Sequence, residues 1–235
     1  MKVDILPMPP TLPEDLRAAL EQLSFPTIGH FLEEGFMDPG IRAMVTPAKI
    51  VGRAITVRVT APDAVLVHKA TELIEPGDAL VIDTGGDARH AMVGETIALA
   101  ARSRGATAIL VDGVCTDIVE LRHMGFPVFA RGTSVLTAKL HGLKPGAINA
   151  QVACGGVVVN PGDVVLADEN GALCLSPEVA RQVLDPAGES DAREPELHDY
   201  LRQGGSLAER SGANRILEGM LHSWRNMNLR NTKSG

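Results

Sequence analysis

The feature that most constrains the fold is a regular alternation of helical segments and short apolar runs in the middle of the chain. A helical pattern rich in alanine covers Met92 to Arg104, an apolar run follows from Ala108 to Val111, and a second helical pattern covers Asp117 to Met124. Another short apolar run extends from Pro127 to Ala130. This order is typical of parallel βαβ units. It predicts an α/β fold with its ligand crevice at the carboxyl ends of the strands.

Other stretches predict further strands. Pro76–Asp83 and Pro161–Asp168 share a Pro-Gly-Asp turn followed by an apolar run, which we interpret as structural rather than catalytic. From Gly52 to Thr60 apolar and other residues alternate, which predicts a strand with one buried face. Between Val152 and Leu175 the predicted strands have no helix between them, so we expect an antiparallel section packed on the parallel one. The result is a β/β/α layering.

Helical patterns flank this core on both sides. Leu16, Leu20 and Leu23 recur at helical spacing behind Pro13, and a second helix is expected to begin near Thr27. The residues after Ser176 are largely helical by composition. We therefore divide the chain into an N-terminal helical segment (1–45), a core (46–178) and a C-terminal helical extension (179–235).

The composition limits the partners and the compartment. The 22 basic and 29 acidic residues leave a formal net charge of −7, which gives nucleic acid no general electrostatic reason to bind. Hydrophobic residues make up 45% of the chain, enough to bury a core, yet no uncharged apolar run reaches the roughly 18 residues of a membrane span. The three cysteines are far apart and odd in number, so we expect free thiols in a cytoplasmic protein.

Two loops at predicted strand ends could carry chemistry. In the first, Asp83–Glu95, glycines let the backbone approach a ligand, and the N–H groups of the following helix could bind a carboxylate. The alternative is a glycine-rich turn with Glu95 in the first turn of a helix. In the second loop, Asp117 and Glu120 fit a helix N-cap with its capping-box partner, and from spacing alone we favour that structural role.

Seven short motifs, taken in order, resemble one known family. They are Gly94-Glu95, Arg104-Gly105-Ala106, Asp112-Gly113 with Asp117, Gly125-Phe126-Pro127-Val128-Phe129-Ala130-Arg131-Gly132, Cys154-Gly155-Gly156-Val157, Pro161-Gly162-Asp163 and Ala167-Asp168-Glu169-Asn170-Gly171. Over about Thr27 to Pro177 the chain resembles the RraA-like family, which includes 4-hydroxy-4-methyl-2-oxoglutarate aldolases and the RraA regulators of ribonuclease E activity. The resemblance implies a swivelling β/β/α-type fold, here with N- and C-terminal helical extensions.

In the aldolase branch the resemblance implies a class II pyruvate aldolase that depends on Mg²⁺ or Mn²⁺ and assembles as a trimer or hexamer. The metal-binding aspartate of the family falls on Asp117 and a supporting acid on Glu95. A glutamate from the C-terminal helix of a neighbouring subunit falls on Glu194, with Glu196 as the second choice. The backbone amides that would hold the pyruvyl carboxylate are those of Gly94, Glu95, Thr96 and Ile97.

The chain departs from the family at one position. The family motif Asp-Gly-x-x-Arg-Asp reads Asp112-Gly113-Val114-Cys115-Thr116-Asp117, so Thr116 stands where an arginine contacts the 2-oxo acid. Threonine cannot replace a charged, bidentate guanidinium, so we expect weak cleavage of the usual substrate. His90 and Arg89 could point into the same crevice, and we count His90 among the substrate-binding residues. Arg122 fits a surface position better.

Two functions follow as hypotheses. The first is a metal-dependent lyase, an aldolase or decarboxylase, that acts on a small 2-oxo acid such as 4-hydroxy-4-methyl-2-oxoglutarate or oxaloacetate through a metal-stabilised pyruvate enolate. The second is a non-catalytic regulator of the RraA type. The retained acids Asp117 and Glu95 favour the enzyme, whereas the loss of the arginine at Thr116 favours the regulator. We expect no nucleic-acid or membrane partner.

Overall fold

The computed structural model describes residues 3–142 and 145–231 as a mixed α/β protein. The first elements along the chain are β1 (Val3–Ile5), α1 (Glu14–Gln22), α2 (Phe25–Ile28), β2 (Arg42–Ala43), β3 (Lys49–Arg58), α3 (Val65–Thr71), β4 (Asp78–Asp83), α4 (Glu95–Ser103), β5 (Ala108–Asp112) and β6 (Val114–Cys115). They are followed by α5 (Ile118–Met124), β7 (Val128–Ala130), β8 (Gly132–Thr133), β9 (Gly146–Ile148), β10 (Val152–Cys154), β11 (Val157–Val159), β12 (Val164–Asp168), β13 (Gly171–Leu175), α6 (Pro177–Arg202), α7 (Leu207–Arg210) and α8 (Ala213–Asn231).

The centre of the fold is a mixed sheet in which β3, β4, β5 and β7 run parallel to one another. Its order in the described residues is β1-β9-β3-β4-β5-β7-β2. The first part of β3 also pairs antiparallel with β12, which in turn pairs with β13. The predicted βαβ units are therefore confirmed. The predicted antiparallel section forms two separate parts. Strands β12 and β13 extend the sheet, and β10 and β11 form a hairpin of their own.

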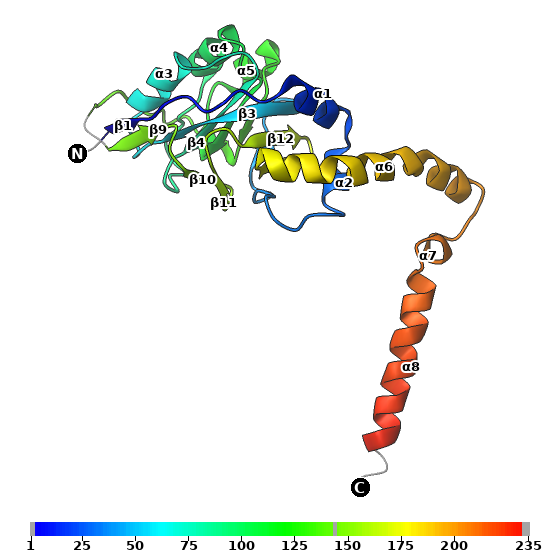
Figure 1. The fold of residues 1–235 in the computed structure, drawn as a ribbon. Helices are drawn as coiled ribbons and strands as arrows, with labels where there is room; N and C mark the ends of the chain where they lie inside the picture. The colour runs from blue at the N-terminus through cyan, green and yellow to red at the C-terminus, as the bar shows by residue number, and fades with distance from the viewer. Residues whose placement is uncertain (1–2, 143–144, 232–235) are drawn as a thin grey trace. The chain divides into compact units, whose positions relative to one another are not determined.

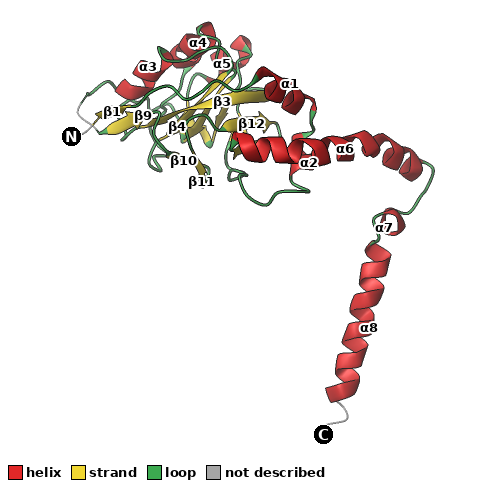
Figure 2. Cartoon of the chain, in the orientation of Figure 1, coloured by secondary structure: helices red, strands yellow, loops and turns green. Residues whose placement is uncertain are grey.

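The sheet is covered on both faces, which produces the predicted β/β/α layers (Figures 1 and 2). Helices α3, α4 and α5 lie on one face, where Leu121 of α5 packs in the same cluster as Ile55 and Leu80 of the sheet. On the other face, Cys154 of the β10–β11 hairpin packs in a cluster with Val81. All three cysteines are buried free thiols, as expected.

The prediction that β3 has one buried face is wrong, because both of its faces are buried. Ile55 and Val57 lie in the cluster under the helices, while Ala54 lies in the cluster on the opposite face. Thr56 is also fully buried, and its hydroxyl donates a hydrogen bond of 2.6 Å to the carbonyl of Ala150. Because Ala54 is small and the hydroxyl of Thr56 is hydrogen-bonded, a second layer can pack on this face.

The N-terminal helices pack on a third cluster with the start of α6. Leu16 and Leu20 of α1 are buried there together with Val183 of α6. Pro13 occupies the N-cap position of α1 rather than the first helical position expected for it. The second helix begins at Phe25 rather than near Thr27, so its proline lies in the first turn, where no backbone donor is needed.

The contacts divide the chain into two compact units, residues 1–188 and 189–235. In the second unit the hydroxyl of Ser206 caps α7, and Arg210 forms an ion pair of 2.6 Å with Glu196. The three-part division made from the sequence stays a prediction. No helix within 3–142 or 145–231 is long and apolar enough to cross a membrane.

Both Pro-Gly-Asp turns close in the same way. Gly77 and Gly162 have φ angles of 92° and 91°, which glycine adopts without steric cost. The carboxylate of Asp78 accepts the N–H of Glu75 at 2.8 Å, and the carboxylate of Asp163 accepts the N–H of Asn160 at 2.8 Å. Each aspartate therefore stabilises its own turn, in keeping with a structural role.

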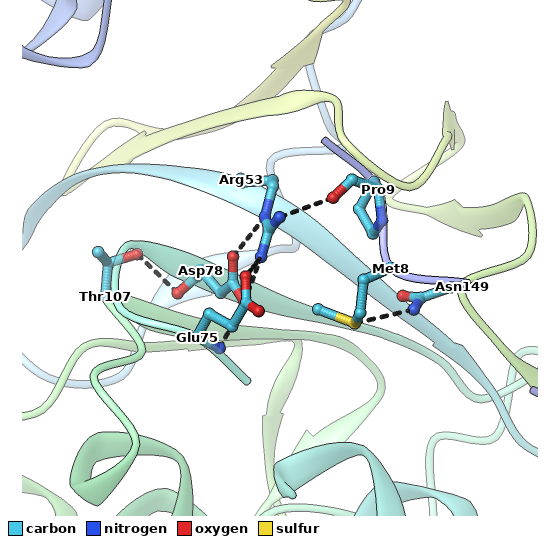
Figure 3. A network of polar contacts seen from close by, with 7 residues as sticks. All are labelled: Met8, Pro9, Arg53, Glu75, Asp78, Thr107 and Asn149. Atoms are coloured by element: carbon cyan, nitrogen blue, oxygen red, sulfur yellow. Dashed lines mark hydrogen bonds and ion pairs between the residues drawn. The ribbon is translucent and has the colours of Figure 1, made fainter. Parts of the chain in front are cut away.

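A buried ion pair joins the first of these turns to β3 (Figure 3). Arg53, only 3% exposed, donates hydrogen bonds of 2.7 and 3.1 Å to Asp78, which is 1% exposed. The same guanidinium donates to Glu75 and to the carbonyl of Pro9, both at 2.8 Å. Burial alone would lower the pKa of Arg53, but the hydrogen bonds to Asp78 and Glu75 raise it. Each guanidinium nitrogen has a partner, and the N-terminal segment is held against the sheet.

We predict that Arg53→Met destabilises the protein by about 3 to 5 kcal/mol, because the change leaves the carboxylate of Asp78 buried without its cation. The matched control is Arg17→Met, which removes ion pairs of half-exposed Arg17 on α1 and should cost less than about 1 kcal/mol. Urea unfolding measures both changes. Equal losses in the two variants would contradict a special role for the buried pair.

Candidate functional site

The candidate site forms where the loops after β4 and β5 meet. These strands are parallel neighbours with Asp83 opposite Asp112, so both loops leave the sheet at the same edge. The N–H of Thr116 in the second loop donates a hydrogen bond of 2.9 Å to the carbonyl of Val93 in the first. The loops lead directly into α4 and α5, so the beginnings of these two helices are brought together.

Gly94 allows the closest approach between the two loops. It precedes α4 with a φ of −140°, which any residue can adopt. Glycine is required here because there is no room for a side chain. A Cβ atom at this position would lie 2.5 Å from a carboxylate oxygen of Asp117 and 2.9 Å from the side-chain methyl of Thr116. Any larger residue would displace these two side chains, including the carboxylate of Asp117.

The carboxylate of Asp117 accepts a hydrogen bond from α4 and makes none with α5, the helix that Asp117 precedes. It occupies the N-cap position of α5 in a left-handed conformation with a φ of 54°, and its side chain makes no capping hydrogen bond there. Its Oδ2 instead accepts the N–H of Glu95 at 2.9 Å. The capping box with Glu120 is therefore not formed. The start of α4 carries the partial positive charge of the helix dipole, which attracts an acidic side chain.

A small pocket opens beside this carboxylate, with a volume of about 140 Å³. Its lining comes from α3, the two loops, the start of α4 and the segment before residue 139: Ala64, His68, Ala91, Met92, Gly94, Thr96, Ile97, Thr116, Asp117, Thr137 and Ala138. Drug-sized ligands occupy pockets of roughly 300 to 1,000 Å³. This pocket therefore suits a small metabolite.

The pocket brings together five of the residues singled out in the sequence. Gly94, Thr96, Ile97, Thr116 and Asp117 all line it. The side chain of Glu95 is exposed in the first turn of α4, next to the N–H that contacts the aspartate.

Sequence reasoning missed two polar side chains of the lining, His68 and Thr137. His68 lies on α3, far from the motifs, and Thr137 lies in a segment without a recognised pattern. A bridge between Ala91 and Thr137 brings this segment beside the first loop. Only the tertiary fold places them here, so no local signal identifies them.

His90 contacts a residue of its own loop and does not line the pocket. Its Nδ1 lies 2.8 Å from the carboxylate of Asp87, which also accepts the N–H groups of His90 and Arg89 at 2.8 and 2.7 Å. Burial works to raise the pKa of Asp87, but these hydrogen bonds together lower it. His90 is absent from the lining, and its predicted contact with substrate stays a prediction.

The two arginines considered as replacements for the missing charge also lie outside the lining. Arg89 is exposed in the first loop, and its carbonyl accepts the hydroxyl of Ser134 at 2.7 Å. Arg122, on α5, donates to the carbonyl of Met44 at 3.4 Å. Neither side chain contributes to the pocket wall.

Asp112, the first residue of the family motif, has a structural role. Its carboxylate accepts Nε of Arg131 at 2.5 Å and the N–H of Gly155 at 2.8 Å. Arg131 also forms an ion pair of 2.9 Å with Asp38. The hydrogen bond to Asp112 raises the pKa of Arg131, so the guanidinium stays charged. These contacts link the end of β5 to the β10–β11 hairpin.

Glu194 and Glu196, the two glutamates considered for the site of a neighbouring subunit, belong to the second unit. Glu194 is exposed on α6, and Glu196 is exposed and paired with Arg210. The assignment of Glu194 to the site of a neighbouring subunit stays a prediction.

The donor set at the pocket suits a hard cation held by oxygen. No group of three or more His, Cys, Asp or Glu side chains in the described ranges is arranged to hold a metal. Burial raises the pKa of the nearby Cys115 thiol to about 11, so no thiolate is present at neutral pH. The carboxylate of Asp117 remains, and Mg²⁺ commonly binds one or two carboxylates and retains several waters. The oxygen donor present is therefore of the kind that suits a hard divalent cation.

Comparison with known proteins agrees with the fold and the motifs. A Halalkalibacterium halodurans protein named "Putative 4-hydroxy-4-methyl-2-oxoglutarate aldolase" is 35% identical over 157 residues, which cover 65% of this chain and 74% of that protein. A crystal structure of an uncharacterized Pseudomonas syringae protein matches with a TM-score of 0.75 at 19% identity, covering 88% of this chain and 98% of that one, and supports the fold alone.

A second solved structure is similar at higher identity. It is Streptomyces coelicolor RraAS2, described as an unusual member of the RNase ES inhibitor RraA protein family, with a TM-score of 0.72, 25% identity and coverage of 80% of this chain and 98% of that one. The family model described as Aldolase/RraA matches residues 27–174, more than half of the sequence. The chain therefore belongs to the RraA-like family.

Proposed function

We propose that the chain is a metal-dependent lyase that breaks a carbon–carbon bond of a small 2-oxo acid, by aldol cleavage or decarboxylation, through a pyruvate enolate. The observation that carries the proposal is the carboxylate of Asp117, held by the N–H of Glu95 at the edge of a small pocket. A relative named as an aldolase supports the same reaction class. In this proposal Asp117 holds Mg²⁺ or Mn²⁺ together with retained waters.

The start of α4 supplies the place for the substrate carboxylate. The first bond of the helix ladder runs from the N–H of Ala98 to the carbonyl of Gly94, so the N–H groups of Thr96 and Ile97 lie ahead of it. Both residues line the pocket. Unused N–H groups and the helix dipole together favour an anion at this position. We assign them to the carboxylate of the 2-oxo acid.

The remaining roles concern proton transfer and charge. When bound, Mg²⁺ or Mn²⁺ polarises the 2-oxo group and stabilises the enolate. Glu95, exposed beside the aspartate, orients a water that carries protons to and from the substrate. Glu194 from a neighbouring copy supplies a second acid. We therefore propose a homotrimer or homohexamer in which each site is completed by an adjacent subunit.

A non-catalytic regulator is the alternative function. It is favoured by the absence of an arginine or lysine among the lining residues, and RraAS2 is described as belonging to an inhibitor family. An intact metal site that enolises pyruvate distinguishes the two, because a binding protein has no need for that chemistry.

We predict that the protein exchanges the methyl protons of pyruvate with D₂O in the presence of Mg²⁺ or Mn²⁺, followed by proton NMR. Asp117→Ala should lower the exchange rate by about 100-fold or more and weaken metal binding in calorimetry, because the proposed ligand is lost. Glu120→Ala is the matched control, since it removes a carboxylate from the first turn of the same helix. Unchanged metal affinity in Asp117→Ala would refute the assignment.

The close approach at Gly94 leads to a second prediction. Gly94→Ala places a methyl 2.5 Å from the carboxylate oxygen of Asp117, so pyruvate exchange should fall at least about tenfold. The free energy of unfolding should fall by only about 1 to 3 kcal/mol. Gly219→Ala, where a methyl meets nothing within 4 Å, is the control. Full activity in Gly94→Ala would show that the position of the aspartate is not critical.

Subunit sharing can be tested by mixing inactive variants. Asp117→Ala and Glu194→Ala should each be inactive, while a co-assembled mixture of the two should recover about one quarter of the wild-type activity, as expected for random pairing of adjacent subunits. Analytical ultracentrifugation measures the oligomeric state of each sample. A monomeric wild type, or a mixture without recovered activity, would contradict the proposed assembly.

A further inference from the structure

Three of the residues that line the pocket are threonines, and none is a lysine or arginine. Thr96, Thr116 and Thr137 come from different segments. We infer that the substrate is a 2-oxo acid with a hydroxylated, uncharged tail, not a dicarboxylate. This inference rests on the proposed lyase function and specifies its substrate class.

The three threonines can contact a tail from several sides. Thr96 belongs to the first turn of α4, Thr116 to the loop before α5, and Thr137 to the segment bridged to Ala91. Each hydroxyl can donate one hydrogen bond and accept others, which matches the hydroxyl groups of a short polyol. Ala64 and Ala138 add apolar wall between them.

Three basic side chains close in sequence to the lining have other partners. Lys139 donates to the carbonyl of Thr137 at 3.3 Å, and Arg122 donates to the carbonyl of Met44. Lys69, next to His68 on α3, is paired with Glu72. Within the lining, His68 carries the one basic side chain. A second carboxylate would therefore find no permanent cation among the lining residues of this chain.

The charges of the proposed complex lead to the same conclusion. The carboxylate of Asp117 and the carboxylate of the 2-oxo acid together balance one divalent cation. A further carboxylate on the tail is left without compensation, and burial of an unpaired charge is costly. If Glu194 from a neighbouring copy completes the site, it adds another negative charge. A hydroxymethyl group avoids this repulsion and can hydrogen-bond to a threonine.

The reaction is an aldol cleavage at the bond between C3 and C4. A base takes the proton of the 4-hydroxyl group, the C4–O bond becomes a carbonyl, and the C3–C4 electron pair moves into the enolate of pyruvate. Protonation of C3 then yields pyruvate and a hydroxyaldehyde. The atoms and charges balance without an oxidant or reductant.

Two five-carbon substrates test the inference, because they differ only in the terminal group. 4,5-Dihydroxy-2-oxopentanoate ends in a hydroxymethyl group and 4-hydroxy-2-oxoglutarate in a carboxylate. We expect kcat/KM to be at least tenfold higher for the first, measured by coupling pyruvate release to lactate dehydrogenase. A tenfold ratio corresponds to about 1.4 kcal/mol. 4-Hydroxy-2-oxopentanoate, which ends in a methyl group, shows how much the terminal hydroxyl contributes.

Variants identify the residues responsible. Thr137→Val should raise KM for the hydroxymethyl substrate about tenfold more than it raises KM for the methyl substrate. Thr133→Val, outside the lining, is the matched control. Thr116→Arg should raise kcat/KM for both five-carbon substrates, since it supplies a guanidinium for the 2-oxo acid group that they share. His68→Gln should leave the preference unchanged.

Each outcome separates this inference from the proposed function. Absence of metal-dependent pyruvate exchange refutes the lyase itself. Normal exchange combined with equal or better use of 4-hydroxy-2-oxoglutarate, or with cleavage of neither five-carbon substrate, overturns the inference about the tail. A dicarboxylate activity that disappears in His68→Gln also overturns it, because the imidazole would then supply the cation.

Discussion

The buried pair of Arg53 and Asp78 is the contact on which the alignment of the sheet depends. It fixes β3 against β4 at the end where the parallel strands begin, and the carbonyl of Pro9 joins the same guanidinium. Register set at one end of a strand extends to the other, so Arg58 comes opposite Asp83. The first loop of the candidate site leaves from Asp83, and the separate pairing of β4 with β5 places Asp83 opposite Asp112, where the second loop begins. The ion pair thus helps to align the strand whose other end carries the first loop.

Much of the fold could be predicted because its signals are local. Apolar runs and helical periods identify β4, α4, β5, α5 and β7, and each Pro-Gly-Asp turn is closed by its own aspartate. The second buried face of β3 could not be predicted. Ala54 and Thr56 resemble solvent-facing residues in an alternating strand, and only the hairpin packed over them by the tertiary fold makes them part of the core.

The site was predictable to the extent that motifs identify it. Family motifs led to Asp117 and the start of α4, whereas spacing alone favoured a capping box that does not form, because the carboxylate is taken by a residue 22 positions earlier. His90 looked available but is held by Asp87, three residues away. His68 and Thr137 come from unmarked segments. Contacts between residues far apart in the sequence decide which side chains reach the pocket, and a short stretch of sequence does not reveal those contacts.

The bond that holds Asp117 in place has a consequence for how such a site can diverge. Its donor is the main-chain N–H of Glu95, not a side chain, and every amino acid except proline carries that group. The acid at position 95 can therefore be exchanged for another residue, which changes the charge beside the pocket, while the carboxylate of Asp117 keeps its location. The glycine before it has no such freedom. One neighbour of the carboxylate is free to vary and the other is not, so the surroundings of Asp117 can diverge without moving it.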